Sequence, residues 1–157
     1  MTVSVQEADF NVADETAHLT DGNTDIGAVV TFTGLVRGGT DTNPAATMTL
    51  EHYPGMTETE LERIEAEAHD RWPLAATRIV HRVGPLQPGE NIVLVIAASR
   101  HRQAAFEAAA FLMDYLKTKA PFWKKETDTA GQGAWVDARE SDNMATDRWQ
   151  NPSKTRR

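Results

Sequence analysis

A segment of 28 residues most constrains the fold and function of this chain, because it combines a helix pattern with clustered positive charge. Residues 99–126 read SRHRQAAFEAAAFLMDYLKTKAPFWKKE, and Ser99 is the expected N-cap of the helix. Arg100, His101 and Arg102 then occupy its first turn, where the positive end of the helix dipole favours acidic residues. Three basic residues there predict a bound anion. Solvated side chains paired with surface carboxylates are the alternative.

Lys117 shares a predicted helix face with apolar residues. At 100° per residue, Phe106, Met113 and Lys117 fall in one stripe, and Arg102 lies on it too. We therefore expect the ammonium group to be partly desolvated on the face that buries the two apolar side chains. The stem of a lysine near a helix C-terminus also covers apolar surface without any functional role, which is the alternative. The helix is expected to end before Pro121.

The other patterns predict a mixed fold. Strands are expected at 2–5, 27–36, 47–53, 77–83, 91–98, 122–126 and 135–139, and helices at 12–19 and 57–71. The second helix starts with a predicted capping box, in which Glu60 stands three residues after Thr57. The strand at 27–36 is expected to be buried, and the two strands around a Gly- and Pro-containing linker, 77–83 and 91–98, to pair antiparallel. This pattern indicates an α+β domain with a mostly antiparallel sheet and two main helices.

Two lysines near the end of this segment and one loop earlier in the chain are further candidate features. Lys124 and Lys125 alternate along the strand predicted at 122–126, so at least one of them should face solvent. Residues 37–46, RGGTDTNPAA, have no apolar pattern and predict a mobile loop that can act as a lid. Residues 1–150 are expected to form one domain, and 151–157 a disordered tail.

Composition excludes several functional classes. The net charge of −7 argues against a general nucleic-acid binder, and its clustered basic residues favour one small anion. No apolar run reaches the ~20 residues that span a bilayer, and the N-terminus lacks the features of a signal peptide, so a cytoplasmic protein is expected. The absence of cysteine excludes a persulfide on the chain itself. The histidines lack metal-ligand spacing, so no metal or other cofactor is expected.

Several motifs together resemble the catalytic (large) subunit family of molybdopterin synthase. They are FTGLVR at 32–37, LEHYPGMTE at 50–58, MDYLKTKAPFWKKE at 113–126 and WVDARES at 135–141. The resemblance implies an α/β hammerhead-type fold, a homodimer, and a heterotetramer with two copies of a small ubiquitin-like sulfur-carrier subunit. It also implies that cyclic pyranopterin monophosphate receives two sulfur atoms from the C-terminal thiocarboxylate of the carrier, which gives the dithiolene of molybdopterin.

The resemblance also implies a set of site residues. The implied substrate site consists of Leu35, Val36, Arg37, His101, Arg102, Lys117, Lys124, Lys125, Glu126 and Arg139. Lys117 corresponds to the essential lysine of the family, with Lys124 in support, and Arg139 to an arginine lent by the neighbouring protomer. Leu35 departs from the pattern, because the family often has a basic residue there, which weakens a side-chain role at this position.

Three functions remain open from the residues alone. A sulfurtransferase without cysteine must receive sulfur from a partner, and a lysine beside an anion site is a suitable proton donor or acceptor. A non-catalytic phosphometabolite or nucleotide binding module uses the same cations. A stand-alone phosphoesterase normally requires a metal cluster or a nucleophile that this sequence lacks. For Lys117, the roles of proton shuttle, electrostatic clamp and transient acyl acceptor stay open.

Overall fold

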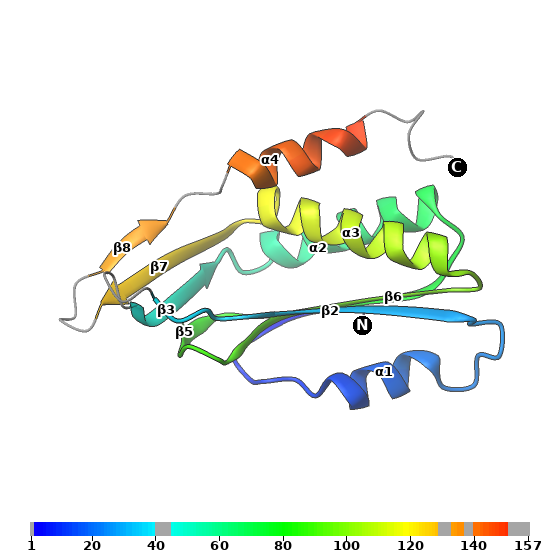
Figure 1. Cartoon of the computed structure of the whole chain (residues 1–157), viewed down its shortest axis with the longest axis horizontal. Coiled ribbons are helices and arrows are strands. Elements are labelled where there is room, and N and C mark those ends of the chain that lie inside the picture. The colour runs from blue at the N-terminus through cyan, green and yellow to red at the C-terminus, as the bar shows by residue number, and fades with distance from the viewer. Residues whose placement is uncertain (1, 40–44, 129–132, 137–139, 151–157) are drawn as a thin grey trace.

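Two four-stranded sheets and their helices make up the fold (Figure 1). The computed structural model describes residues 2–39, 45–128, 133–136 and 140–150. The first sheet has the order β1 (Val3–Gln6), β4 (Leu74–Arg82), β6 (Asn91–Ser99), β2 (Ala28–Leu35). The second sheet has the order β5 (Gly84–Leu86), β3 (Ala45–His52), β7 (Phe122–Asp128), β8 (Gly133–Val136). The helices are α1 (Val12–Thr20), α2 (Met56–Arg71), α3 (Arg102–Thr118), α4 (Glu140–Asp147) and the 3₁₀ turn η1 (Arg148–Gln150).

The strand pairing confirms the predicted α+β class with mostly antiparallel sheets. β1 pairs with β4 in parallel, and the other described pairs in both sheets are antiparallel. β4 and β6 pair antiparallel as predicted, with Ile79 opposite Val95. The linker between them contains β5, three residues too short for a periodic signal, and β5 joins the second sheet through β3.

The main core lies between the first sheet and the helices α2 and α3. β6 is the inner strand between β4 and β2, and its residues from Val93 to Ser99 are buried. Phe111 and Leu112 of α3 are fully buried, and Trp72 and Trp149 pack edge-on near Phe111. Burial of this apolar surface is the main stabilising contribution, and truncating one such side chain to alanine typically costs about 3–5 kcal/mol. On the opposite face α1 covers a smaller cluster around Phe10, Val80, Leu94 and Ile96 (Figure 1).

The predicted capping box of α2 is wrong. The helix begins at Met56 with Gly55 as N-cap, whose φ of +85° suits glycine, and the Glu58 carboxylate accepts a hydrogen bond from the Gly55 N–H at 2.7 Å. Thr57 is instead fully buried. Its hydroxyl donates to the Pro121 carbonyl at 3.2 Å and accepts from the Tyr53 N–H at 3.0 Å, so it ties α2 to the start of β7.

The predicted N-cap of α3 is also wrong. Ser99 is the last residue of β6, and its hydroxyl donates to the Pro73 carbonyl at 2.8 Å. His101 occupies the N-cap position, so Arg102 is the single member of the basic cluster inside the helix. Arg100 lies 3.3 Å from the Asp25 carboxylate on the surface, which fits the alternative of solvated ion pairs for this residue.

β2 lies at the edge of the first sheet, although its composition predicted a buried strand. Val29, Phe32 and Leu35 are exposed, because β6 covers only one side of β2. Runs of β-branched and aromatic residues indicate a strand, but they do not tell whether a neighbour covers it. The centre of the predicted loop (residues 40–44), Arg139 and the predicted tail (151–157) lie outside the described residues.

Candidate active site

Lys124 and Glu126 share one face of the second sheet. Lys124 pairs with Leu50 and Glu126 with Met48 across the antiparallel ladder, and directly opposed residues point to the same face. Leu50 and Met48 are buried, and the Lys124 Nζ lies 3.8 Å from the Glu126 Oε1, with both side chains partly exposed. The lysine therefore rises from a mostly apolar surface with a carboxylate beside it.

Lys125 faces the other way. It follows Lys124 in β7 and is exposed, as Trp123 is on the same outer face. The prediction that at least one of the two lysines faces solvent is confirmed. The structure thus brings Lys124 and Glu126 together and leaves Lys125 on the opposite side of the sheet.

Lys117 lies in the last turn of α3, just before the chain enters β7. The predicted stripe is only half buried, because Met113 is 9% exposed whereas Phe106 is 60% exposed. Lys117 itself is exposed in the single chain, so the predicted burial of Phe106 and desolvation of the ammonium group are both wrong there. Helix periodicity shows which residues share a face, but an apolar face that is exposed in the single chain has the same periodicity as a buried one.

His81 belongs to the same region, although no sequence pattern points to it as a site residue. Its ring is stacked on Phe122, with centroids 3.8 Å apart and an interplanar angle of 17°, and the residue is only 5% exposed. The pKa of His81 is lowered to about 4, chiefly because the ring is buried and to a smaller extent because Lys117 and His52 act on it with positive charge. Only the tertiary contact between His81 of β4 and Phe122 at the start of β7 reveals this environment.

The end of β2 lies at the same end of the first sheet as Lys117. Leu35 is opposite Asn91 at the start of β6, and α3 packs against β2 and β6 as it returns from the end of β6. Val36 is buried with Met48 and Leu50 between the sheets, whereas Leu35 is 53% exposed. Arg37 follows directly and is exposed. Arg37, Lys117 and Lys124 therefore belong to one region around the junction of the two sheets.

His101 and Arg102 lie at the opposite end. They precede or begin α3, which starts beyond Ser99, opposite Ala28 at the other end of the β2–β6 ladder. A single pocket built by Arg37, His101 and Arg102 of one chain is therefore wrong. The sequence placed these residues together by charge, whereas the strand register separates them along the length of the sheet.

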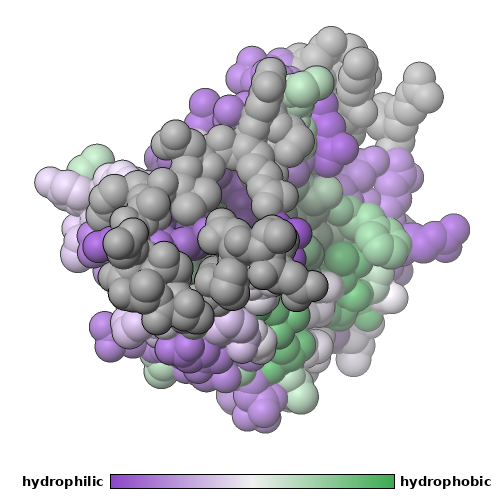
Figure 2. Space-filling view, turned by 60° about the vertical axis from the view of Figure 1, so that its left-hand side comes forward, coloured by the Kyte–Doolittle hydropathy of each residue, from purple (hydrophilic) through white to green (hydrophobic). Residues whose placement is uncertain are grey.

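Exposed apolar side chains follow the edge formed by β2 and α3. We call this set the apolar flank: Val29 (37% exposed), Phe32 (41%), Leu35 (53%) and Phe106 (60%). Figure 2 shows hydrophobic surface gathered on the right-hand side of that view. Exposed apolar patches often mark interaction sites, so the apolar flank is a candidate interface.

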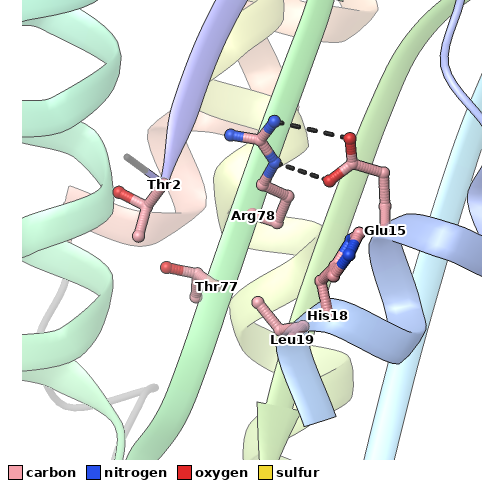
Figure 3. Close-up of a pocket in the computed structure, with 6 residues that line it drawn as sticks. All are labelled: Thr2, Glu15, His18, Leu19, Thr77 and Arg78. Atoms are coloured by element: carbon pink, nitrogen blue, oxygen red, sulfur yellow. Dashed lines mark hydrogen bonds and ion pairs between the residues drawn. The ribbon is translucent and has the colours of Figure 1, made fainter. Parts of the chain in front are cut away.

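A separate pocket of about 350 Å³ lies beside α1. It is lined by Thr2, Glu15, His18, Leu19, Thr77 and Arg78, and a 2.8 Å ion pair between Glu15 and Arg78 crosses its wall (Figure 3). None of the predicted site residues lines it. Within the described ranges, no group of three or more His, Asp or Glu side chains is placed to hold a metal ion. The described helices include none that is long and apolar enough to span a membrane.

Comparisons with known proteins identify the family of the chain. A family model described as MoaE protein matches residues 5–119. A molybdopterin synthase catalytic subunit from Mesorhizobium japonicum is 57% identical over 154 residues, which cover 98% of this chain and 96% of that protein. The structure of molybdopterin cofactor biosynthesis protein E from Burkholderia multivorans has a TM-score of 0.81 at 50% identity and covers 96% of this chain and 97% of its own.

A more distant structure shares the fold. It is a protein–protein complex of subunits 1 and 2 of molybdopterin-converting factor from Helicobacter pylori, with a TM-score of 0.71 at 19% identity, over 88% of this chain and 92% of that chain. The matched range, the identity and the coverage together identify the family. The chain belongs to the MoaE protein family, and the similar protein from M. japonicum is a molybdopterin synthase catalytic subunit.

Proposed function

We propose that this chain is the catalytic subunit of a molybdopterin synthase. It transfers sulfur from the C-terminal thiocarboxylate of a small carrier protein to cyclic pyranopterin monophosphate, and two transfers give the dithiolene. The observation that carries this proposal is the placement of Lys117, Lys124 and Arg37 around one junction between two sheets, in a chain of this family. In each transfer a C–S bond forms at a substrate carbon while a C–O bond at that carbon breaks, and the C–S bond of the carrier is replaced by a C–O bond that restores its carboxylate.

The charges of the site fit this chemistry. The substrate is a small anion, and cationic side chains in an otherwise acidic protein attract it locally. Lys117 is the proposed catalytic residue and Lys124 its support, because a lysine near a second cation loses its proton more readily. Glu126 accompanies Lys124 at 3.8 Å. Leu35 and Val36 are proposed to shape the wall near Arg37, and Lys125 remains a sequence-based prediction of a substrate contact.

Two chains are proposed to share each site. A two-fold axis that crosses the apolar flank at right angles to α3 reverses the direction of the helix in the second copy. The Arg102 end of one helix then lies on the side of the Lys117 end of the other, and Phe106 and Phe32 become covered. His101 and Arg102 of the second copy thereby complete the anion site. Arg139, outside the described residues, stays a prediction of a further residue from the second copy.

A small carrier is the proposed second partner. The fold neighbour from H. pylori is a complex of subunits 1 and 2 of molybdopterin-converting factor. The absence of cysteine gives an independent reason, because the chain has no thiol that can carry sulfur itself. Two carriers on a homodimer give a heterotetramer. A cytoplasmic location and the lack of a resident cofactor stay predictions from the sequence.

A reconstitution tests the proposed function. The purified chain is mixed with a thiocarboxylated carrier and cyclic pyranopterin monophosphate, and the dithiolene product is quantified. The same carrier with an ordinary C-terminal carboxylate is the control, and we expect product only with the thiocarboxylate. Recovery of unchanged substrate from a tight complex, without product, would instead support the non-catalytic binding module.

A further inference from the structure

We propose that His81 is a positioning residue, whose Nε2 accepts a hydrogen bond from the ammonium group of Lys117 and so sets its place during sulfur transfer. This inference rests on the proposed function, in which Lys117 is catalytic. It assigns a role to a buried histidine that the sequence patterns did not select.

The tautomer of His81 follows from its hydrogen bond. Nδ1 lies 2.8 Å from the carbonyl oxygen of Arg82, and a carbonyl oxygen only accepts hydrogen bonds. Nδ1 therefore carries the proton, and in the neutral ring Nε2 presents a lone pair. Nε2 is therefore the ring nitrogen that can accept a hydrogen bond from a group that approaches the site.

The ring is fixed near the end of α3. In β4 the side chains of Thr77 and Ile79 point to the face that α2 and α3 cover, because Thr77 bonds His69 of α2 and Ile79 belongs to the main core. By the period of two, His81 points to that face as well, at the end of the sheet above which α3 ends. The stack on Phe122 holds the ring plane, since Phe122 lies in β7, five residues after Lys117.

The surroundings keep this acceptor neutral. Lys117 of α3 and His52 of β3 act on the ring with positive charge, and Lys124 of β7 lies two residues after Phe122 on the same strand face. The Glu58 carboxylate of α2 lies 3.8 Å from Nε2 of His52. Burial and these cations lower the pKa of His81 to about 4, so at neutral pH the ring accepts a hydrogen bond without taking up a proton.

Two substitutions distinguish the effect of Nε2 as a hydrogen-bond acceptor from the packing effect of the aromatic ring. His81→Phe keeps an aromatic ring on Phe122 but removes both nitrogens, whereas His81→Gln keeps an acceptor near the position of Nε2. We expect His81→Phe to lower kcat about tenfold, the rate equivalent of one hydrogen bond, with little change in KM. His81→Gln should recover most of this loss. His18→Phe, at an exposed histidine of α1 on the opposite face of the first sheet, is the matched control and should keep wild-type kcat.

A second readout does not depend on product formation. The pH dependence of acylation of Lys117 by a small reagent, followed by mass spectrometry, should shift to lower pH in His81→Phe, because an acceptor stabilises the ammonium form. An unchanged acylation profile together with wild-type kcat in a folded His81→Phe protein overturns the inference. If wild-type protein makes no dithiolene, the proposed function fails, and the acylation profile still decides whether His81 acts on Lys117.

Discussion

Arg102 and Lys117 occupy the two ends of the same helix, so about 22 Å of α3 separates them at a rise of 1.5 Å per residue. No side chain bridges that distance within one chain. Because Phe106 lies between them and is exposed, the surface that joins the two ends is the one a second copy is proposed to cover. The distance along α3 is thus the reason why a shared site is proposed.

Substitution of Lys117 should affect turnover more than binding. Lys117→Ala is expected to fold, to bind the carrier and to lose nearly all product formation, because a catalytic group acts mainly in the transition state. Lys117→Arg should also be poor, since a guanidinium keeps the charge but does not release its proton. Steady-state kinetics with the reconstituted system checks both. Near wild-type kcat in Lys117→Arg would reduce Lys117 to an electrostatic clamp.

The apolar flank should control self-association. Phe106→Asp places a charge at the centre of the proposed interface, so we expect the protein to sediment as a monomer at micromolar concentration, whereas the wild type sediments as a dimer. Met144→Asp, at an exposed methionine of α4, is the control and should leave the dimer intact. A dimeric Phe106→Asp protein would place the interface elsewhere.

The cap of α2 depends on Glu58 rather than Glu60. Glu58→Ala removes the carboxylate that accepts the Gly55 N–H, and should lower the free energy of unfolding by about 1 kcal/mol. Glu62→Ala, on the exposed surface of the same helix, should change it by less than about 0.5 kcal/mol. Urea titrations measure both values. Equal effects of the two substitutions contradict the assigned cap.

His81 should make the fold sensitive to acid. Its folded pKa of about 4 is below the ordinary value of 6.5, so the unfolded chain binds this proton more readily between these pH values. The free energy of unfolding should therefore decrease as the pH falls from 6.5 to 4, by an amount of up to about 3 kcal/mol from this residue. In His81→Phe that part of the decrease should disappear. Urea unfolding at several pH values checks it, and identical slopes in both proteins contradict it.

Local patterns predicted the elements but not their surroundings. The period of two in β3 and the period of 3.6 in α2 come from contacts on one side of each element, so Leu61, Ile64 and Ala68 are buried as expected. Three residues are too few for such a signal in β5. Caps are decided by one or two hydrogen bonds, which explains why Gly55 and His101 were missed as N-caps.

Only the site residues that are close to one another in the sequence could be predicted to lie together. Lys117 and Lys124 are linked by a short turn at Pro121, so their common region follows from local structure. His81 lies in this region because it is near the end of β4. Arg102 lies far from it because α3 places Arg102 and Lys117 at its two ends. Long-range pairing of this kind has no local sequence signal. The exposed Phe106 is a second example. An apolar residue at an interface with a second copy and an apolar residue in the core give the same sequence pattern.

A mixture of two inactive variants tests the central claim of a shared site at Lys117 most directly. Lys117→Ala and Arg102→Ala proteins are each assayed alone, then combined in equal amounts under conditions of demonstrated subunit exchange. Random pairing leaves one intact site in half of the dimers, so the mixture should recover about a quarter of wild-type dithiolene formation. No recovery above the separate variants, despite exchange, would contradict a site that combines Lys117 of one chain with Arg102 of the other.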